Sequence, residues 1–385
     1  SVCENYADIE VPVYMVGGWA DGYTNAVFRT LEHLPGPKKG LIGPWAHKYP
    51  HFAKPGPRIG FLQECLRWWD QHLKGIDTRI MEEPQLRAWL QDPVDPAPFH
   101  DQRPGRWIAE PGWSGAGVDT RTLFPADGKL SDRETGVGLT IRSPQNAGAA
   151  SGTWCLYGAV ADGPLDQNGE AGLMTAFETE PLDDDLDLLG FPMVHADVHS
   201  DAPQANIAAT LSAVDEGGHA TLISFGVLNL THRNSHAAPE AMPEGTSVAA
   251  SIQLNACGQR ITRGQRLRLA LGTAYWPVIW PGQTDATLTL SNTRLDLPVR
   301  AGRDIDATLA PFLPPESAPP LETEVLAQPG FERRRTIDHI TGTETFERVS
   351  DDGTETHKHT GITVRDVNHE TFRIHPDDPN SAICI

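Results

Sequence analysis

The 385-residue chain has few cysteines, and their arrangement excludes two common kinds of small scaffold. They are odd in number, widely scattered and include no Cys-x-x-Cys pair, so neither a disulfide framework nor a structural zinc site is indicated. Scattered thiols suit a reducing compartment, and we expect a cytoplasmic protein. The five positions are Cys3, Cys65, Cys155, Cys257 and Cys384.

Basic residues and long apolar runs are also scarce. The 31 Lys and Arg against 51 Asp and Glu leave a formal net charge of −20. Nucleic acids and anionic membranes attract clustered Lys and Arg, so we expect neither as a partner. No apolar run approaches the length of a membrane span, and no signal peptide is visible, although Ser1 does not look like a natural start.

What the chain does contain predicts a mixed fold of two or three domains. An apolar share of 39% is adequate for real hydrophobic cores at this length. The 36 Gly and 32 Pro accompany few long helical patterns, which indicates many short strands joined by turns. No internal repeat is apparent.

Residues 1–80 predict the last part of a doubly wound α/β sheet. Val11–Gly18 reads as a buried parallel strand, Thr24–Leu34 as a helix, Gly40–Gly43 as the next strand core and Pro57–Gly75 as a longer helix. Two strands cannot build an independent core of this kind. The predicted core-facing stripe of the longer helix is Leu62, Cys65, Leu66, Trp69 and Leu73.

From residue 81 onward the pattern becomes that of short strands. Residues 81–300 alternate with period two between Asp, Gly and Pro turns, which suggests a two-layered sandwich or jelly roll. Residues 301–385 open with a Pro-rich crossover at Ala310–Pro320 and continue with further β structure over Arg333–Ile374. The strands expected in the middle region are Gln85–Leu90, Thr153–Tyr157, Met193–His199, Ile207–Val214, Ala220–Leu228, Ser247–Leu254 and Arg266–Ala270.

Two short motifs carry the chemistry. Gly-Gly-Trp-Ala-Asp-Gly at Gly17–Gly22 and Gly-Pro-Trp-Ala-His at Gly43–His47 each end an apolar, β-branched stretch. Asp21 and His47 are therefore expected on loops at the carboxyl ends of neighbouring strands, in the order acid then base that α/β hydrolases use. The alternative is a turn-forming aspartate and a loop histidine packed by Trp45.

These motifs, followed by a Trp-rich helix that ends His-Leu-Lys-Gly-Ile-Asp, resemble the hydrolases grouped with cocaine esterase, α-amino acid ester hydrolases and X-Pro dipeptidyl-peptidases. The resemblance implies a serine hydrolase that cleaves small esters or peptides through an acyl-enzyme, without a cofactor. It places the triad acid on Asp21 and the base on His47. It makes Tyr23 a wall of the substrate pocket, and we add Trp19 and Trp45 of the same motifs to that pocket.

The resemblance extends over roughly residues 10 to 300. Gln204–Val227 and Gly264–Trp276 are similar to the family's carboxyl-terminal β domain, a galactose-binding-like jelly roll. The predicted fold is therefore a carboxyl-terminal remnant of an α/β-hydrolase sheet, followed by an all-β jelly roll and extra β structure.

The family's nucleophile has no counterpart in this sequence. Its Gly-x-Ser-Tyr-x-Gly elbow, oxyanion-hole tyrosine and helical cap lie upstream of the acid. Ser114 in Gly112–Gly117 echoes an elbow, but it follows the histidine and lies in a Pro/Gly/Trp loop, so we reject it. We expect the chain alone to be inactive, with an amino-terminal catalytic half as its missing partner. The exposed Trp68–Trp69 helix would then favour self-association into a homo-oligomer.

Other candidate sites have simpler interpretations. His195, Asp197 and His199 share one strand face, where a solvent-facing strand is favoured over a metal site. Asp183–Asp187 reads as a solvated acidic loop. Trp276 and Trp280 form either a sugar platform or core packing. The alternative function is a non-catalytic carbohydrate- or protein-binding jelly roll with a vestigial triad.

Overall fold

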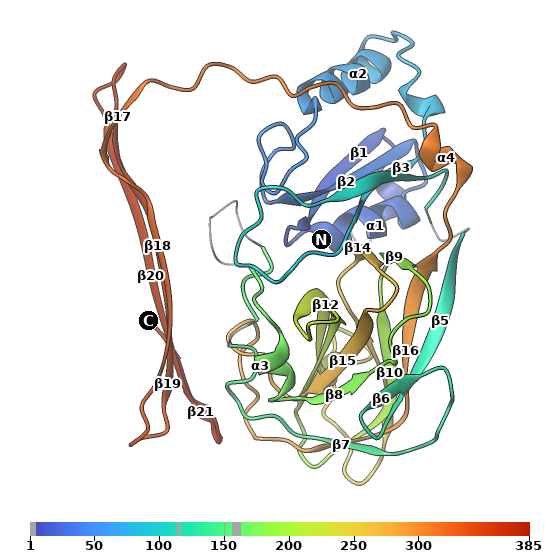
Figure 1. Cartoon of the computed structure of the whole chain (residues 1–385), viewed down its shortest axis with the longest axis vertical. Coiled ribbons are helices and arrows are strands. Elements are labelled where there is room, and N and C mark those ends of the chain that lie inside the picture. The colour runs from blue at the N-terminus through green and yellow to red at the C-terminus, as the bar shows by residue number, and fades with distance from the viewer. Residues whose placement is uncertain (1–4, 114–116, 150, 156–162) are drawn as a thin grey trace.

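The computed structural model describes residues 5–113, 117–149, 151–155 and 163–385. It has three parts: a helix-flanked part around the first three strands, a β body whose strands continue that sheet, and a long sheet of the last five strands beside both (Figure 1). The fold is thus mixed and mostly strands, as the composition indicated.

The helix-flanked part begins the chain and has the predicted order of strand, helix, strand, helix. Its elements are β1 (Val13–Ala20), α1 (Thr24–His33), β2 (Lys38–Ala46), α2 (Phe61–Leu73) and β3 (Leu86–Gln91). The three strands pair in parallel, and α1 and α2 lie on opposite faces of the sheet (Figure 1). This arrangement explains the continuous burial of β2, because a strand covered on both faces has no side toward water.

α2 exposes the face that its sequence pattern placed in the core. Its buried residues are Glu64, which pairs with Arg67, and Trp68, whose ring lies 5.3 Å from that of Tyr14 on β1. The predicted core-facing stripe is therefore wrong, because this helix packs on the sheet through Phe61 and Trp68, which lie outside that stripe. The exposed members of the stripe are Leu62 (45%), Leu66 (56%), Trp69 (51%) and Leu73 (74%).

The middle of the chain forms the predicted array of short strands. The strands are β4 (Gly105–Glu110), β5 (Val118–Ala126), β6 (Lys129–Ser131), β7 (Leu139–Ile141), β8 (Thr175–Glu178), β9 (Leu186–Gly190), β10 (Met193–Ser200), β11 (Asn206–Val214), β12 (Ala220–Asn229), β13 (Val248–Gln253), β14 (Cys257–Ile261), β15 (Arg266–Gly272) and β16 (Leu288–Arg300). Short helices are η2 (Tyr6–Asp8), η3 (Ile80–Glu82), α3 (Asn168–Ala171), η4 (Leu230–His232) and α4 (Asp304–Ala307). One expected strand is wrong: Thr153–Cys155 is not a strand, and Leu156 and Tyr157 lie outside the described residues.

The strands of the β body enclose one apolar core. β10 pairs with both β13 and β16 on one side, and β11 pairs with both β12 and β15 on the other. Their inward side chains meet in a single cluster that includes Val194, Leu211 and Leu290. Burial alternates along β10, so His195, Asp197 and His199 lie on its outer face, as the period-two pattern predicts.

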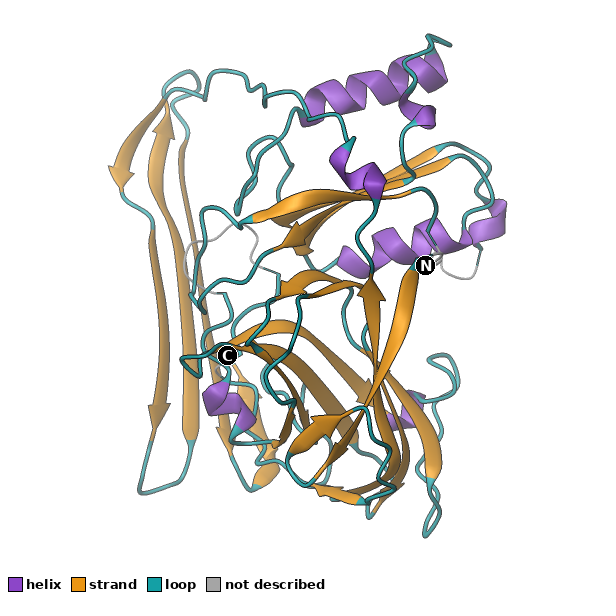
Figure 2. Cartoon of the chain, turned by 45° about the vertical axis from the view of Figure 1, so that its right-hand side comes forward, coloured by secondary structure: helices purple, strands orange, loops and turns teal. Residues whose placement is uncertain are grey.

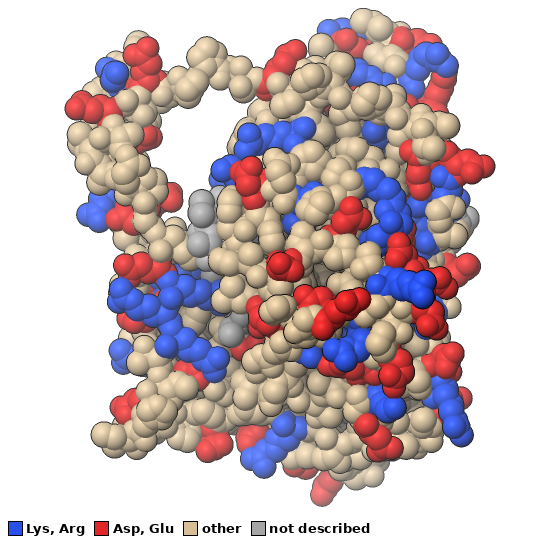
Figure 3. All heavy atoms as spheres, in the orientation of Figure 1, with Lys and Arg blue, Asp and Glu red and all other residues tan. Residues whose placement is uncertain are grey.

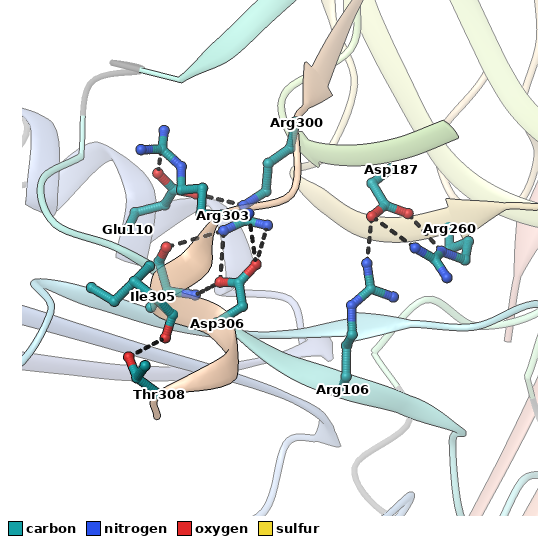
Figure 4. A network of polar contacts seen from close by, with 10 residues as sticks. Arg106, Glu110, Asp187, Arg260, Arg300, Arg303, Ile305, Asp306 and Thr308 are labelled. Carbon is teal, nitrogen blue, oxygen red and sulfur yellow. Dashed lines mark hydrogen bonds and ion pairs between the residues drawn. The ribbon is translucent and has the colours of Figure 1, made fainter. Parts of the chain in front are cut away.

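A continuous sheet and a buried ion network join the helix-flanked part to the β body. β3 meets β14 at Gln91 and Gln259, and β14 continues into β9. Seen from another side, the long sheet runs alongside both of these parts (Figure 2). Figure 4 shows Arg300, at the end of β16, between acids of β4 and α4. Its Nε donates to Glu110 Oε1 over 2.6 Å and its Nη1 to Asp306 Oδ2 over 2.7 Å, and its side chain is fully buried.

The end of the chain forms a separate antiparallel sheet, which confirms the expected extra β structure. Its strands are β17 (Thr323–Ala327), β18 (Gly330–Ile337), β19 (Glu344–His357), β20 (Thr363–His375) and β21 (Asp378–Cys384). The sheet meets the β body in an apolar cluster of Ala149, Trp276, Phe346 and Ile374. Because Trp276 is buried there, it packs the seam and cannot present a ring face to a sugar, whereas Trp280 is half exposed.

The Pro-rich segment Ala310–Pro320 contains neither helix nor strand, as predicted, but its first residues are anchored. Arg87 of β3 donates from Nη2 to the Ala310 carbonyl over 2.9 Å and stacks on the Phe312 ring at 3.7 Å. The Gly60 N–H donates to the Leu313 carbonyl over 2.7 Å. The crossover therefore packs on the helix-flanked part before it reaches the long sheet.

On the face that Figure 3 shows, charge is distributed rather than gathered. Acidic and basic side chains are interspersed over the face that Figure 3 shows, and the connection to the long sheet leaves an opening beneath it. Among the described residues, no helix has the length and apolar character needed to cross a membrane.

Candidate active site

Asp21 and His47 meet at one end of the parallel sheet. β1 ends one residue before Asp21, and β2 ends one residue before His47. Because carboxyl ends of parallel strands lie at the same edge, the two side chains project into the same region. His47 Nδ1 and Asp21 Oδ2 are 3.0 Å apart, which is hydrogen-bond distance.

Glycine at position 18 permits this approach of the two strands. A Cβ at Gly18 would lie 2.0 Å from the carbonyl oxygen of Trp45, closer than any real contact allows. The chain then turns, and Thr24 Oγ1 lies 2.5 Å from the Gly18 carbonyl and 2.7 Å from the Asp21 carbonyl. Gly18 and the Thr24 hydroxyl, which donates to both carbonyls, together hold the Asp21 loop next to the end of β2.

The carboxylate of Asp21 is held by both of its oxygens. Oδ1 accepts the backbone N–H of Tyr23 over 2.8 Å, while Oδ2 faces the imidazole of His47. The Asp21 side chain is 13% exposed and that of His47 is 39% exposed. Since Nδ1 faces the carboxylate, Nε2 is the ring nitrogen that can exchange a proton with a reacting group.

A hollow of about 490 Å³ contains both side chains in its wall. Lys48, Tyr49 and Phe61 line it from the segments that follow β2. The Tyr23 ring lies 5.7 Å from the ring of His47 and is 68% exposed, so it stands beside the pair at the surface. The geometry provides room next to the imidazole for a small molecule.

Trp19 and Trp45 are core residues in this structure. Trp19 is 5% exposed and donates from Nε1 to the Trp89 carbonyl over 2.6 Å, and Trp45 is 1% exposed and donates to the Pro57 carbonyl over 2.8 Å. Trp45 also lies in the wall of the hollow beside His47. A contact of either ring with substrate stays a prediction.

Cys155 lies close to the pair, and sequence reasoning missed it. Ligand atoms of Asp21, His47 and Cys155 all lie within 4.8 Å of one another, and they form a cluster of the described residues that could hold a metal ion. No motif marks Cys155, because it comes from a distant loop that the β body places there. Ser114, the rejected elbow serine, lies outside the described residues.

The other polar candidates are engaged in structural contacts. His195 Nδ1 lies 2.8 Å from Ser251 Oγ, and its Nε2 is 3.4 Å from an oxygen of Asp296. Burial, followed by the charge of Arg294, lowers the pKa of His195. Asn292 donates to Asp197 over 2.7 Å.

The acidic segment Asp183–Asp187 was expected to be a solvated loop, and this expectation is wrong for Asp187. Asp187 belongs to β9 and is buried, and Arg260 of β14 and Arg106 of β4 both donate to its carboxylate (Figure 4). The pattern of alternating Asp and Leu there is that of a strand with a paired acid.

Comparison with protein families identifies the chain. Residues 78–311 match the model of the X-Pro dipeptidyl-peptidase C-terminal non-catalytic domain. The chain belongs to the X-Pro dipeptidyl-peptidase (S15) family. Residues 1–49 match the model of the X-Pro dipeptidyl-peptidase (S15 family) itself, and this S15 segment contains both Asp21 and His47. The resemblance stated from the motifs is confirmed.

Curated relatives of this S15-family chain are esterases of low sequence identity. The cocaine esterase of Rhodococcus sp. (strain MB1 Bresler) is 22% identical over 303 residues, which cover 72% of this chain and 51% of the esterase. A putative serine esterase of Mycobacterium bovis is 24% identical over 57% of this chain and 36% of its own length. The chain thus spans about half the length, or less, of the curated relatives it matches.

Solved structures share the fold of this S15-family chain. A CocE/NonD family hydrolase from Staphylococcus aureus matches with a TM-score of 0.58 and 12% identity, over 77% of this chain and 55% of that one. An α-amino acid ester hydrolase matches with a TM-score of 0.59 and 16% identity, over 78% of this chain and 57% of that one.

Proposed function

We propose that this chain supplies the acid and base of a serine-hydrolase triad that cleaves small esters or amides through an acyl-enzyme. The observation that carries the proposal is the 3.0 Å contact between Asp21 Oδ2 and His47 Nδ1 at the carboxyl edge of a parallel sheet. The match of residues 1–49 to the S15 model supports it, because both residues lie in that segment. Tyr23 beside His47 is proposed as a wall of the acyl pocket.

In this proposal His47 acts first as a base and then as an acid. A serine hydroxyl attacks the substrate carbonyl carbon while its proton moves to His47 Nε2, and Asp21 stabilises the imidazolium. The bond to the leaving group then breaks as Nε2 returns the proton to it. A water molecule repeats the two steps on the acyl-enzyme, which releases the acid and restores the serine.

We propose that the serine and the oxyanion hole come from a polypeptide segment outside this chain. Two surfaces suit such a segment. β1 ends the path of paired strands in the described sheet, so its outer edge is open for a further strand. α2 on the same part carries the exposed side chains of Leu66 and Trp69, which a covering segment would bury.

The same proposal assigns the remaining regions. Residues 1–80 form the carboxyl-terminal part of the catalytic domain, 81–300 a galactose-binding-like jelly roll and 301–385 an additional β region. The family model over residues 78–311 describes a non-catalytic domain, which favours a structural role for the β body in this proposal.

The test is hydrolysis of an activated acyl ester by the protein expressed from the whole reading frame that encodes this chain. The substrate p-nitrophenyl acetate reports acyl-enzyme turnover directly. His47→Ala is expected to lower kcat by about 10⁴-fold or more, because loss of one triad member forfeits most of the rate gain. His359→Ala, an exposed histidine on the long sheet, is the matched control and should leave kcat unchanged.

Unchanged turnover in His47→Ala would remove this residue from the mechanism. Absence of turnover in the unmodified full-length protein, together with binding of a carbohydrate or a protein, would favour the alternative of a binding module with a vestigial triad.

A further inference from the structure

A second cavity lies between the helix-flanked part and the β body. Its volume is about 100 Å³, enough for a small organic molecule. Ala20 and Ala46 at the ends of β1 and β2 line it, together with residues of β12 and β14. Three aromatic residues, Trp19, Phe99 and Trp154, also line it.

The charge of this cavity is opposite to that of the chain. The whole protein carries a formal net charge of −20, yet no Asp or Glu is among the described residues that line the cavity. Its ionisable side chains are Lys54, His100, Arg103 and Cys257. Burial raises the pKa of Cys257 to about 12, so its thiol stays neutral. The cavity therefore favours an anion electrostatically.

The ammonium group of Lys54 already has an acidic partner, Asp101. Its Nζ lies 3.3 Å from Asp101 Oδ1 and 5.5 Å from the centre of the Phe99 ring. Burial, followed by the charge of Arg103, lowers the pKa of His100, so this imidazole is neutral at pH 7. The remaining cation is Arg103.

Arg103 has an incomplete set of partners in the described chain. Its Nε is buried without a hydrogen-bond acceptor, and Nη2 makes one long contact of 3.4 Å with Gln259 Oε1. None of the described carboxylates lies within ion-pair distance of it. Burial lowers its pKa to about 10, which shows that its surroundings disfavour the charge.

Arg300 shows what this fold does with a buried guanidinium that has only a structural role. Its side chain is surrounded by Glu110 and Asp306, which neutralise the charge and accept its N–H groups. A guanidinium fork matches two carboxylate oxygens. The guanidinium of Arg103 offers the same pair of donors, but no described carboxylate pairs with it.

We propose that this cavity binds a small monocarboxylate with an apolar body. The carboxylate takes the open donors of Arg103, and the body packs against Trp19, Phe99 and Trp154. Asp21 and His47 do not line this cavity, but it adjoins the hollow that holds them, because Ala46 lines both spaces. The apolar wall favours an organic acid over inorganic phosphate, because phosphate offers nothing to bury against the rings.

Calorimetric titration of this chain with butanoate tests the proposal. Butanamide is the neutral ligand of the same shape, and phosphate is the inorganic anion. We expect one equivalent of butanoate to bind, with butanamide at least tenfold weaker and phosphate also at least tenfold weaker. The Arg103→Gln variant should lose butanoate affinity by at least tenfold, whereas Arg133→Gln, which alters an exposed arginine, should retain it.

A conservative variant distinguishes loss of the binding group from loss of folding. Arg103→Lys keeps the charge and should still prefer butanoate over butanamide, with a melting temperature that shows it is folded. Four results would each overturn the proposal. They are equal binding of butanoate and butanamide, full butanoate affinity in folded Arg103→Gln, binding of phosphate alone, and no binding of butanoate to the unmodified chain.

Discussion

At the residue scale, close packing sets the geometry of the candidate active site. Gly18 lets β1 approach the backbone of Trp45, and the Tyr23 N–H fixes one oxygen of Asp21 so that the other faces His47. The proximity of Asp21 and His47 could be predicted because short motifs at the ends of neighbouring strands carry them. Cys155 could not, since its position depends on how a distant loop is folded.

Lys39 provides a test of burial at this scale. Its side chain is 2% exposed, and Nζ donates to the Ile80 carbonyl over 2.7 Å and lies 3.6 Å from Glu83. Burial lowers the pKa of Lys39 from 10.5 to about 8, against the opposing effect of Glu83. Between pH 8 and 10.5 the folded chain has released this proton and the unfolded chain keeps it. The contribution of Lys39 to the free energy of unfolding therefore rises with pH across that window.

We expect the stability of the unmodified chain to rise relative to Lys39→Met by up to about 3 kcal/mol from pH 8 to 10.5. Urea unfolding of both proteins at several pH values measures this difference. The exposed Lys129 serves as control, and Lys129→Met should give a difference that does not change with pH. A constant difference for Lys39→Met would show that Lys39 is not buried as described.

At the element scale, the joint between β4, β16 and α4 depends on one buried arginine. Arg300 donates to Glu110, to Asp306 and, over 3.1 Å, to the Ala109 carbonyl. Removing one partner of a buried ion pair leaves the other charges uncompensated. Because β4 pairs along its length with β3 of the helix-flanked part, this joint connects that part to β16 of the β body.

Arg300→Met is expected to lower the free energy of unfolding by roughly 3–5 kcal/mol. Chemical denaturation gives the value. Arg79→Met, which breaks an exposed pair with Glu82, should cost less than about 1 kcal/mol. A loss no larger than that of the surface control would contradict a structural role for the network. Adding Glu110→Gln to Arg300→Met should recover part of the loss.

Periodicity predicted most elements but not all of their faces. β10, β11, β12, β13 and β15 follow period-two or β-rich runs and lie close to their expected bounds. The short strands β6, β7 and β8 have only three or four residues, too few for a periodic signal. α2 was predicted as a helix, but amphipathicity identifies an apolar face without identifying what covers it, and Leu66 and Trp69 lie in solvent.

At the scale of the whole molecule, we propose that the exposed face of α2 is a surface for association. Leu62, Leu66, Trp69 and Leu73 form an apolar stripe on one helix, and surfaces of this kind mark contact sites. In the proposed full protein a nucleophile-bearing segment would cover it. In this chain by itself, a second copy is the available partner.

We expect the chain to self-associate, and Leu66→Glu with Trp69→Glu to weaken the association at least tenfold. Sedimentation equilibrium measures both. Ile340→Glu, which alters an exposed apolar residue on the turn before β19, should leave the association unchanged. A monodisperse monomer for the unmodified chain, at concentrations where the variant is tested, would contradict this use of the surface.

The coupling of one carboxylate to one imidazole is the central claim, and ¹⁵N NMR of the His47 ring measures it most directly. We expect neutral His47 to carry its proton on Nδ1, with Asp21→Asn shifting the proton toward Nε2, because the amide no longer stabilises the Nδ1–H tautomer. Neutral His47 protonated mainly on Nε2, with ring shifts that Asp21→Asn leaves unchanged, would contradict the account.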